Sequence, residues 1–151
     1  MIVWDDQYST GVDYIDKQHQ NLIEHFNNFV DSVHQGRGRI KIGEMLGYLQ
    51  FYTEWHFKRE ESCMHDHKCP VAQDNIEAHN YFKTKLDQMS TYYFEESDTD
   101  IGIIYDLIDE LSKWIVNHIL RIDGELRHCG VTPAYAKTQE MDAYQDDQKA
   151  G

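Results

Sequence analysis

The chain has few residues that interrupt helices and few that carry positive charge. Among its 151 residues are only two prolines, Pro70 and Pro133, and both lie between or after periodic segments. Lys and Arg number 14 against 27 Asp and Glu, which gives a formal net charge of −13. Nucleic acid and anionic membranes are therefore poor partners, because both bind clustered positive charge.

Long apolar runs and an even set of cysteines are also missing. No run approaches the roughly 20 apolar residues that a membrane-spanning helix needs. The first residues, MIVWDDQYSTG, lack the basic start and the apolar stretch of a signal peptide. Three cysteines, an odd number, do not suggest a disulfide framework in a chain of this size. We therefore expect one soluble, cytoplasmic domain with a core of its own.

Apolar residues recur at alternating intervals of three and four along four segments, as they do on the buried stripe of a helix. The pattern predicts helices over about residues 16–34, 40–64, 71–94 and 101–128, with short connections between antiparallel neighbours. An aromatic arm with Trp4, Tyr8 and Tyr14 precedes them. The expected fold class is all-α, an up-down-up-down four-helix bundle with an N-terminal arm over residues 1–130. A polar, mobile tail is expected over 131–151.

Histidines and carboxylates lie on the inward stripes of these helices. His56 and Glu60, four residues apart, share one face. A buried glutamate must be paired, protonated or metal-bound, because an isolated buried charge is costly. One core histidine is more often hydrogen-bonded than metal-bound, but several that converge with carboxylates reverse that preference. The pattern predicts a metal site in the bundle core of the kind that iron accepts, with ligands His19, His56, Glu60, His79, His118 and Asp123.

Other histidines fail the same test. His25, His34 and His128 do not align with the stripes, so we expect them to face solvent. The segment C63-M-H65-D-H67-K-C69 contains metal-binding residue types but lacks the two-residue cysteine spacing of structural zinc sites. We interpret it as a polar turn between the second and third helices.

The sequence resembles the hemerythrin family, particularly its bacterial single-domain members. The resemblance covers about residues 1–128. It rests on the Trp4 arm, D16-K-Q-H19-Q-N-L22, H56-F-K-R-E60-E, Pro70 followed by N75…H79…F82, and W114-I-V-N-H118-I…D123. The family fold is a four-helix bundle that holds two iron ions, bridged by an oxygen species and two carboxylates. Members bind dioxygen reversibly at these ions.

The resemblance implies a role for each candidate. The bridging carboxylates would be Glu60 and Asp123. The iron with an open position for dioxygen would be held by His19 and His56, and the other iron by position 75, His79 and His118. An apolar pocket over the open iron would be lined by Trp114, Ile115 and Ile119. The resemblance thus implies a non-heme, oxo- or hydroxo-bridged diiron protein for dioxygen or another small diatomic molecule or anion.

The sequence departs from the family pattern at Asn75, where a histidine is expected. Asparagine is shorter than histidine, and its neutral carbonyl oxygen is a weak iron ligand. Three outcomes stay open: the amide oxygen binds the metal, a water molecule replaces the imidazole, or the second iron is held weakly or lost.

Two functions follow from these possibilities. The first is an oxygen carrier, store or sensor without turnover. The alternative is a diiron redox enzyme that acts on peroxide, nitric oxide or O2 through an extra open position at Asn75. A ferritin-like iron store ranks lower, because that class uses Glu-x-x-His motifs and no candidate ligand histidine has a glutamate three residues earlier.

Without metal, the Glu60 and Asp123 carboxylates should repel each other, and at least one of them should take up a proton.

Overall fold

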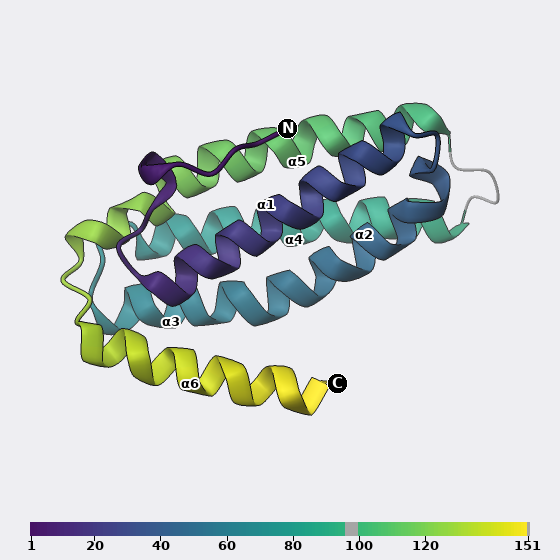
Figure 1. Cartoon of the computed structure of the whole chain (residues 1–151). Coiled ribbons are helices and arrows are strands. Elements are labelled where there is room, and N and C mark those ends of the chain that lie inside the picture. Colours follow the sequence, from purple (N-terminus) through teal and green to yellow (C-terminus); the bar gives the residue numbers. More distant parts are fainter. Residues whose placement is uncertain (96–99, 151) are drawn as a thin grey trace.

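Four helical rods lie side by side, and each runs antiparallel to the rod that precedes it in the chain (Figure 1). This computed structural model describes residues 1–95 and 100–150, with side chains of the C-terminal helix as far as residue 141. The rods are α1 (Asp13–His34), then α2 (Gly38–Tyr52) continued by η2 (Thr53–Phe57) and α3 (Lys58–Asp66), then α4 (Ala72–Glu95) and α5 (Ile101–Arg121). The described residues contain no strand, and the predicted all-α bundle is confirmed.

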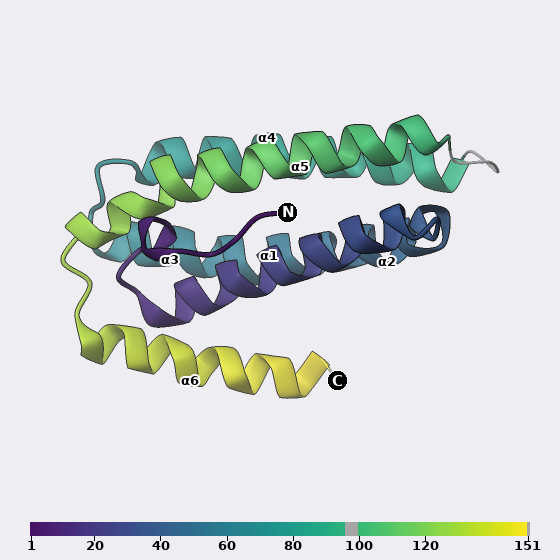
Figure 2. The ribbon, with the colours of Figure 1, turned by 45° about the horizontal axis from the view of Figure 1, so that its top comes forward.

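The apolar stripes of the rods face one another and form the core. The pair α4 and α5 lies over the pair made by α1 and the α2–α3 rod (Figure 2). A large apolar cluster fills the space between them and includes Phe26, Leu49, Tyr52 and Ile115, each 2% exposed or less. Each such side chain stabilises the fold by about 1.5–3 kcal/mol relative to an exposed position. A smaller cluster around Ile15, at the start of α1, includes residues of α3 and of the chain after α5.

The N-terminal arm, which contains the short 3-10 helix η1 (Asp6–Tyr8), is fixed to the bundle by polar contacts. Asn27 bonds both the amide and the carbonyl of Ile2, at 3.0 and 2.8 Å. The carboxylate of Asp16, in the first turn of α1, accepts hydrogen bonds from the hydroxyls of Ser9 and Thr10 at 2.7 Å. These contacts fix the first turn of α1, where Asp16 lies about one turn before His19.

Two stretches of the predicted helices have a different backbone. The second rod contains a π-helical segment, η2, where the sequence predicts an uninterrupted α-helix. The fourth helix ends at Arg121 rather than near His128, and the 3-10 segment η3 (Asp123–His128) follows. Spacings of three and four residues fit both α- and π-turns, so periodicity does not reveal the first change. The second change brings the Asp123 carboxylate back toward the bundle, because five residues of α-helix would turn it about 140° away from His118.

The polar segment expected as a tail after residue 130 contains a helix, α6 (Pro133–Ala150), which the sequence analysis did not predict, and its mobility stays a prediction. It runs back along the outside of the bundle beside α1 (Figures 1 and 2). Its first turns are held by the Tyr135 hydroxyl, which donates to Asp66 at 2.8 Å, and by an ion pair between Lys17 and Glu140. Polar composition alone does not reveal these contacts, because each partner is distant in sequence.

The expectation of a chain without disulfides is wrong as well. Cys69, between α3 and α4, is bonded to Cys129, at the end of η3, with a Cα–Cα distance of 5.3 Å. Because 60 residues separate the two cysteines, the cross-link restricts the unfolded chain and contributes about 4 kcal/mol in the chain-entropy model. The third cysteine, Cys63, is a buried free thiol. None of the described helices is long and apolar enough to cross a bilayer.

Candidate metal centre

All six predicted ligands converge in the interior of the bundle, and none is more than 5% exposed. They come from five different parts of the fold: His19 from α1, His56 and Glu60 from the second rod, His79 from α4, His118 from α5, and Asp123 from η3. The order of the rods therefore brings together residues that are up to about a hundred positions apart in the chain.

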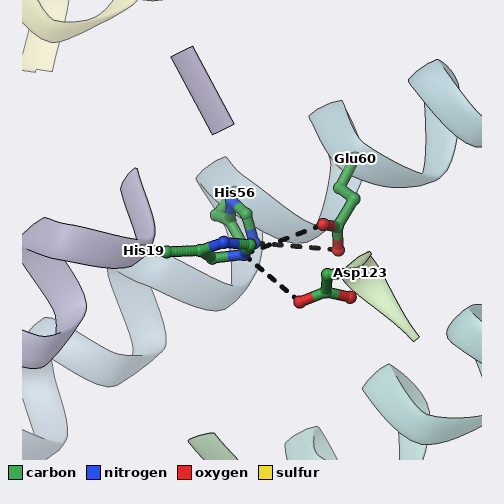
Figure 3. Close-up of side chains that lie close together, drawn as sticks. All are labelled: His19, His56, Glu60 and Asp123. Atoms are coloured by element: carbon green, nitrogen blue, oxygen red, sulfur yellow. Dashed lines mark hydrogen bonds and ion pairs between the residues drawn. The ribbon is translucent and has the colours of Figure 1, made fainter. Parts of the chain in front are cut away.

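The first group consists of His19, His56, Glu60 and Asp123 (Figure 3). The Nε2 atom of His19 lies 3.2 Å from the Asp123 carboxylate and 3.7 Å from that of Glu60. The Nε2 atom of His56 lies 3.7 Å from Glu60 and 3.1 Å from Nε2 of His19. Two imidazole nitrogens and two carboxylates thus face a common point.

The second group consists of Glu60, His79, His118 and Asp123, so both carboxylates belong to both groups. The Nε2 atom of His79 lies 3.3 Å from Glu60, and that of His118 lies 3.1 Å from Asp123. Within each group the ligand atoms lie within 4.8 Å of one another. Two neighbouring cations, bridged by Glu60 and Asp123, fit this arrangement.

The hydrogen bonding of the cluster also fits bound cations. Among the described residues, several of its buried atoms make no hydrogen bond: Glu60 Oε1, both oxygens of Asp123, and Nε2 of His79 and of His118. Native proteins seldom leave so many buried polar atoms unsatisfied. Atoms that ligate an ion point at the ion and not at one another, so short contacts without hydrogen-bond geometry are expected around a metal position.

Two residues that the sequence reasoning missed orient the imidazoles. The Nδ1 atom of His56 lies 2.8 Å from Gln18 Oε1, and the Nδ1 atom of His79 lies 2.8 Å from Glu61 Oε1. Each contact fixes the ring and leaves Nε2 as the metal-facing atom. Each partner directly adjoins a ligand in sequence, Gln18 before His19 and Glu61 after Glu60, and that adjacency is the signal that could have found them.

The buried carboxylates change the pKa values of two imidazoles of the cluster. Burial would lower the pKa of His19, but contact with Asp123 and Glu60 raises it. Burial likewise opposes protonation of His79, yet Glu60 and Glu61 raise its pKa to about 9. Burial would raise the pKa of Asp123, but His118 and His19 hold it well below its ordinary value. Asp123 is therefore not the carboxylate that takes up a proton, and the expectation that at least one of the two carboxylates does so stays a prediction.

His56 behaves in the opposite way to the other two imidazoles. Burial and the neighbouring charge of His19 hold its pKa well below the ordinary range. A neutral imidazole is the form that binds metal, so His56 is ready to ligate without losing a proton.

Asn75 lies beside the second group and is fully buried. Its amide nitrogen donates to Glu60 Oε2 at 3.3 Å, and among the described residues its carbonyl oxygen has no hydrogen-bond partner. The residue thus occupies the position that the family pattern gives to a third imidazole of this group. The amide contacts a bridging carboxylate there.

The residues expected to line the ligand pocket lie at different places. The Trp114 ring stacks on His118, with centroids 4.4 Å and planes 13° apart, and lies 6.4 Å from the His79 ring. Trp114 therefore covers the second group, whereas the resemblance implies a place over the iron held by the first group. Ile115 and Ile119 are buried in the large apolar cluster, and their role in a pocket stays a prediction.

The remaining histidines do not join the centre. The expectation that His25, His34 and His128 face solvent is confirmed, and the His25 ring stacks on Tyr48. The segment from Cys63 to Cys69 forms the end of α3 and a turn, as expected. His67 there contacts the carbonyl of Cys63 at 2.7 Å, and Cys69 is in the disulfide.

Replacement of a ligand should empty the centre. We expect His56→Ala or Glu60→Ala to lower the metal content from two ions per chain to less than one, because each change removes a ligand and leaves charged neighbours unpaired. Elemental analysis of purified protein measures this. The matched control is His25→Ala, which removes an exposed histidine. Full metal content in the His56 or Glu60 variant would rule out the centre described above.

The metal-free protein should lose stability in mildly alkaline solution. The pKa of His79 is raised from an ordinary value of 6.5 to about 9, so its contribution is complete below pH 6.5 and is lost as the pH rises through 9. The shift corresponds to a contribution of His79 to the free energy of unfolding on the order of 3 kcal/mol. Urea denaturation on both sides of this window measures the loss. The His79→Gln variant should lose less stability over this pH range than wild type, because only His19 then contributes. Equal losses of stability in the two proteins would contradict the assignment of the loss to His79.

Comparison with known proteins agrees with this geometry. A family model described as "Hemerythrin HHE cation binding domain" matches residues 10–127. The bacteriohemerythrin of Pseudomonas aeruginosa (strain LESB58) is 30% identical over 123 residues, which cover 82% of this chain and 77% of the relative. The bacteriohemerythrin of Clostridium acetobutylicum is 27% identical over 136 residues, which cover 83% and 98% of the two chains. The chain belongs to the hemerythrin family of HHE cation-binding domains.

Proposed function

We propose that this protein holds two non-heme iron ions in its core and binds dioxygen reversibly there, as a carrier, a store or a sensor. The observation that carries the proposal is the sharing of Glu60 and Asp123 by the two ligand groups. A mixed set of imidazole and carboxylate ligands in a helical bundle is typical of diiron centres. The names of the bacteriohemerythrin relatives agree with this choice of metal and ligand.

The residues of the chain have separate tasks in this function. Two ferrous ions, when held by these residues, would supply the electrons for reversible binding of dioxygen. Glu60 and Asp123 hold the two metal positions next to each other and offset their positive charge. Gln18 and Glu61 fix the imidazoles of His56 and His79, so that Nε2 of each ring stays aimed at its metal position. The buried side chains Ile115 and Ile119 keep water out of the surrounding core.

The experiment that tests the function combines iron content with visible spectra. Protein loaded with ferrous iron without air should contain two ions per chain. It should develop a charge-transfer band in air and lose that band when oxygen is removed. A single ion per chain, or bleaching that does not reverse, would contradict reversible binding.

Ile115 should slow the irreversible oxidation of the iron. Its side chain is fully buried and lies one turn before His118. Ile115→Ala should admit water and accelerate autoxidation by about tenfold, and Ile115→Glu could place a carboxylate on the metal. The decay of the visible band in air measures the rate. The control is Ile104→Ala, which creates a cavity of similar size elsewhere on α5. Equal autoxidation rates in wild type and all these variants would show that Ile115 does not line the ligand pocket.

Asn75 favours a second candidate function, a diiron redox enzyme that acts on peroxide, nitric oxide or O2. The second group lacks a third imidazole, and the Asn75 carbonyl oxygen is unsatisfied among the described residues. A surface groove of about 410 Å³ between α4 and α5 reaches His118, with Lys113 and Arg121 in its lining. Glu110 also lines this groove, so its charged side chains are of both signs.

The substitution Asn75→His separates the two functions. If Asn75 leaves an open position, wild type should hold the second iron less tightly, autoxidise faster and bind more than one azide per centre. Asn75→His should tighten iron binding about tenfold and reduce azide binding to one event. Titration by absorbance measures both, and Asn80→His, an exposed position on α4, is the control. Identical behaviour of wild type and Asn75→His would leave the oxygen carrier as the better interpretation.

A further inference from the structure

The disulfide joins the two segments of chain that carry the bridging carboxylates. Cys69 lies between α3, which contains Glu60, and α4, which contains His79. Cys129 lies at the end of η3, six residues after Asp123. The 60-residue loop that the bond closes therefore contains the ligands His79, His118 and Asp123. A covalent bond thus holds together the two sides of the metal centre at this end of the bundle.

Asp123 depends on this anchor more than the other ligands do. It lies on a short 3-10 segment, whereas His19, His79 and His118 lie within long α-helices. Asp123 contacts His19 and His118, and η3 is also held by the buried Leu126 and by the Arg127 guanidinium, which donates to the carbonyls of Gly124, Gln7 and Ser9. Short segments held by few contacts open at low free energy. Loss of the cross-link should therefore loosen the Asp123 carboxylate first.

The bond is placed where a reductant can reach it. Cys129 is half-buried, while Cys69 is 6% exposed. Exposed Lys68 directly precedes Cys69 in the chain, and a nearby positive charge favours a thiolate. Lys68 also has a φ of 51°, an unfavourable conformation for a residue with a side chain. Burial raises the pKa of the third thiol, Cys63, to about 11, so that it stays protonated and unreactive.

We propose that the Cys69–Cys129 bond is a thiol-exchange site at which a dithiol reductant controls how firmly the centre holds its metal. One thiolate of the reductant attacks the Cys129 sulfur, forms a mixed disulfide and expels the Cys69 thiolate, which takes a proton. The second thiol of the reductant then displaces Cys129. Two electrons and two protons pass to the protein, and the reductant leaves as its cyclic disulfide. The oxidised chain keeps its metal, and the reduced chain releases it faster.

This inference rests on the metal centre and not on oxygen binding, so the test uses metal release. Protein loaded anaerobically with ferrous iron is mixed with excess chelator, and the coloured iron complex is followed over time. The proteins compared are oxidised wild type, wild type reduced with dithiothreitol, and the Cys69→Ser/Cys129→Ser double variant without reductant. We expect release about tenfold faster in the last two. Free-thiol titration after unfolding should give one thiol in oxidised wild type and three after reduction.

Two controls separate a local effect from general loss of stability. Cys63→Ala treated with dithiothreitol should behave like reduced wild type, because Cys63 takes no part in the exchange. Val33→Ala removes buried volume at the end of α1, at the opposite end of the bundle from η3 (Figure 1). It should lower the melting temperature without accelerating metal release.

The outcomes are distinct. Failure of oxidised wild type to load iron would contradict the metal centre itself. Equal release rates in oxidised, reduced and double-variant protein would overturn the thiol-exchange site and leave the centre intact. Equal acceleration by Val33→Ala would show a merely structural cross-link, and three free thiols that resist oxidation would show that the bond does not form.

Discussion

The rest of the structure depends on two carboxylates that are buried among four imidazoles. Glu60 and Asp123 each contact histidines from two different rods, and both are 1% exposed or less. Burial of such charges is stabilising only when opposite charge compensates them, whether from imidazolium in the metal-free chain or from bound cations. The centre therefore links all four rods to one another, and metal binding and folding are coupled.

The backbone departs from regular α-helix at the places where it presents ligands. His56 lies in the π-helical segment η2, and Asp123 begins the 3-10 segment η3. Regular helices in a bundle present side chains at fixed angles, and small irregularities change the direction of one ligand without moving a whole rod. Single-turn π-helices are frequent at functional sites for this reason. The hydrogen bonds of Gln18 and Glu61 then fix the rings that these rods supply.

Two features of this chain concern the candidate metal centre. Asn75 stands where the family pattern is expected to have a histidine, and its amide donates to the Glu60 carboxylate. The Cys69–Cys129 bond anchors the segment that supplies the other bridging carboxylate, Asp123. One feature weakens the set of metal ligands, and the other restrains the backbone that holds it.

The sequence by itself determined the bundle and the ligands, because helical periodicity and the types of residue on each stripe are local properties. The stripes containing His56, Glu60, His79 and His118 need only the 3.6-residue repeat to be recognised. Only the tertiary structure decided the π-turn, the end of α5 before Asp123, the Cys69–Cys129 bond and helix α6. Each of these depends on contacts between segments that are far apart in the chain, such as Tyr135 with Asp66. The pattern of residues within one helix does not show which distant residues it will contact. Such contacts contribute free energy only after the rods have packed together.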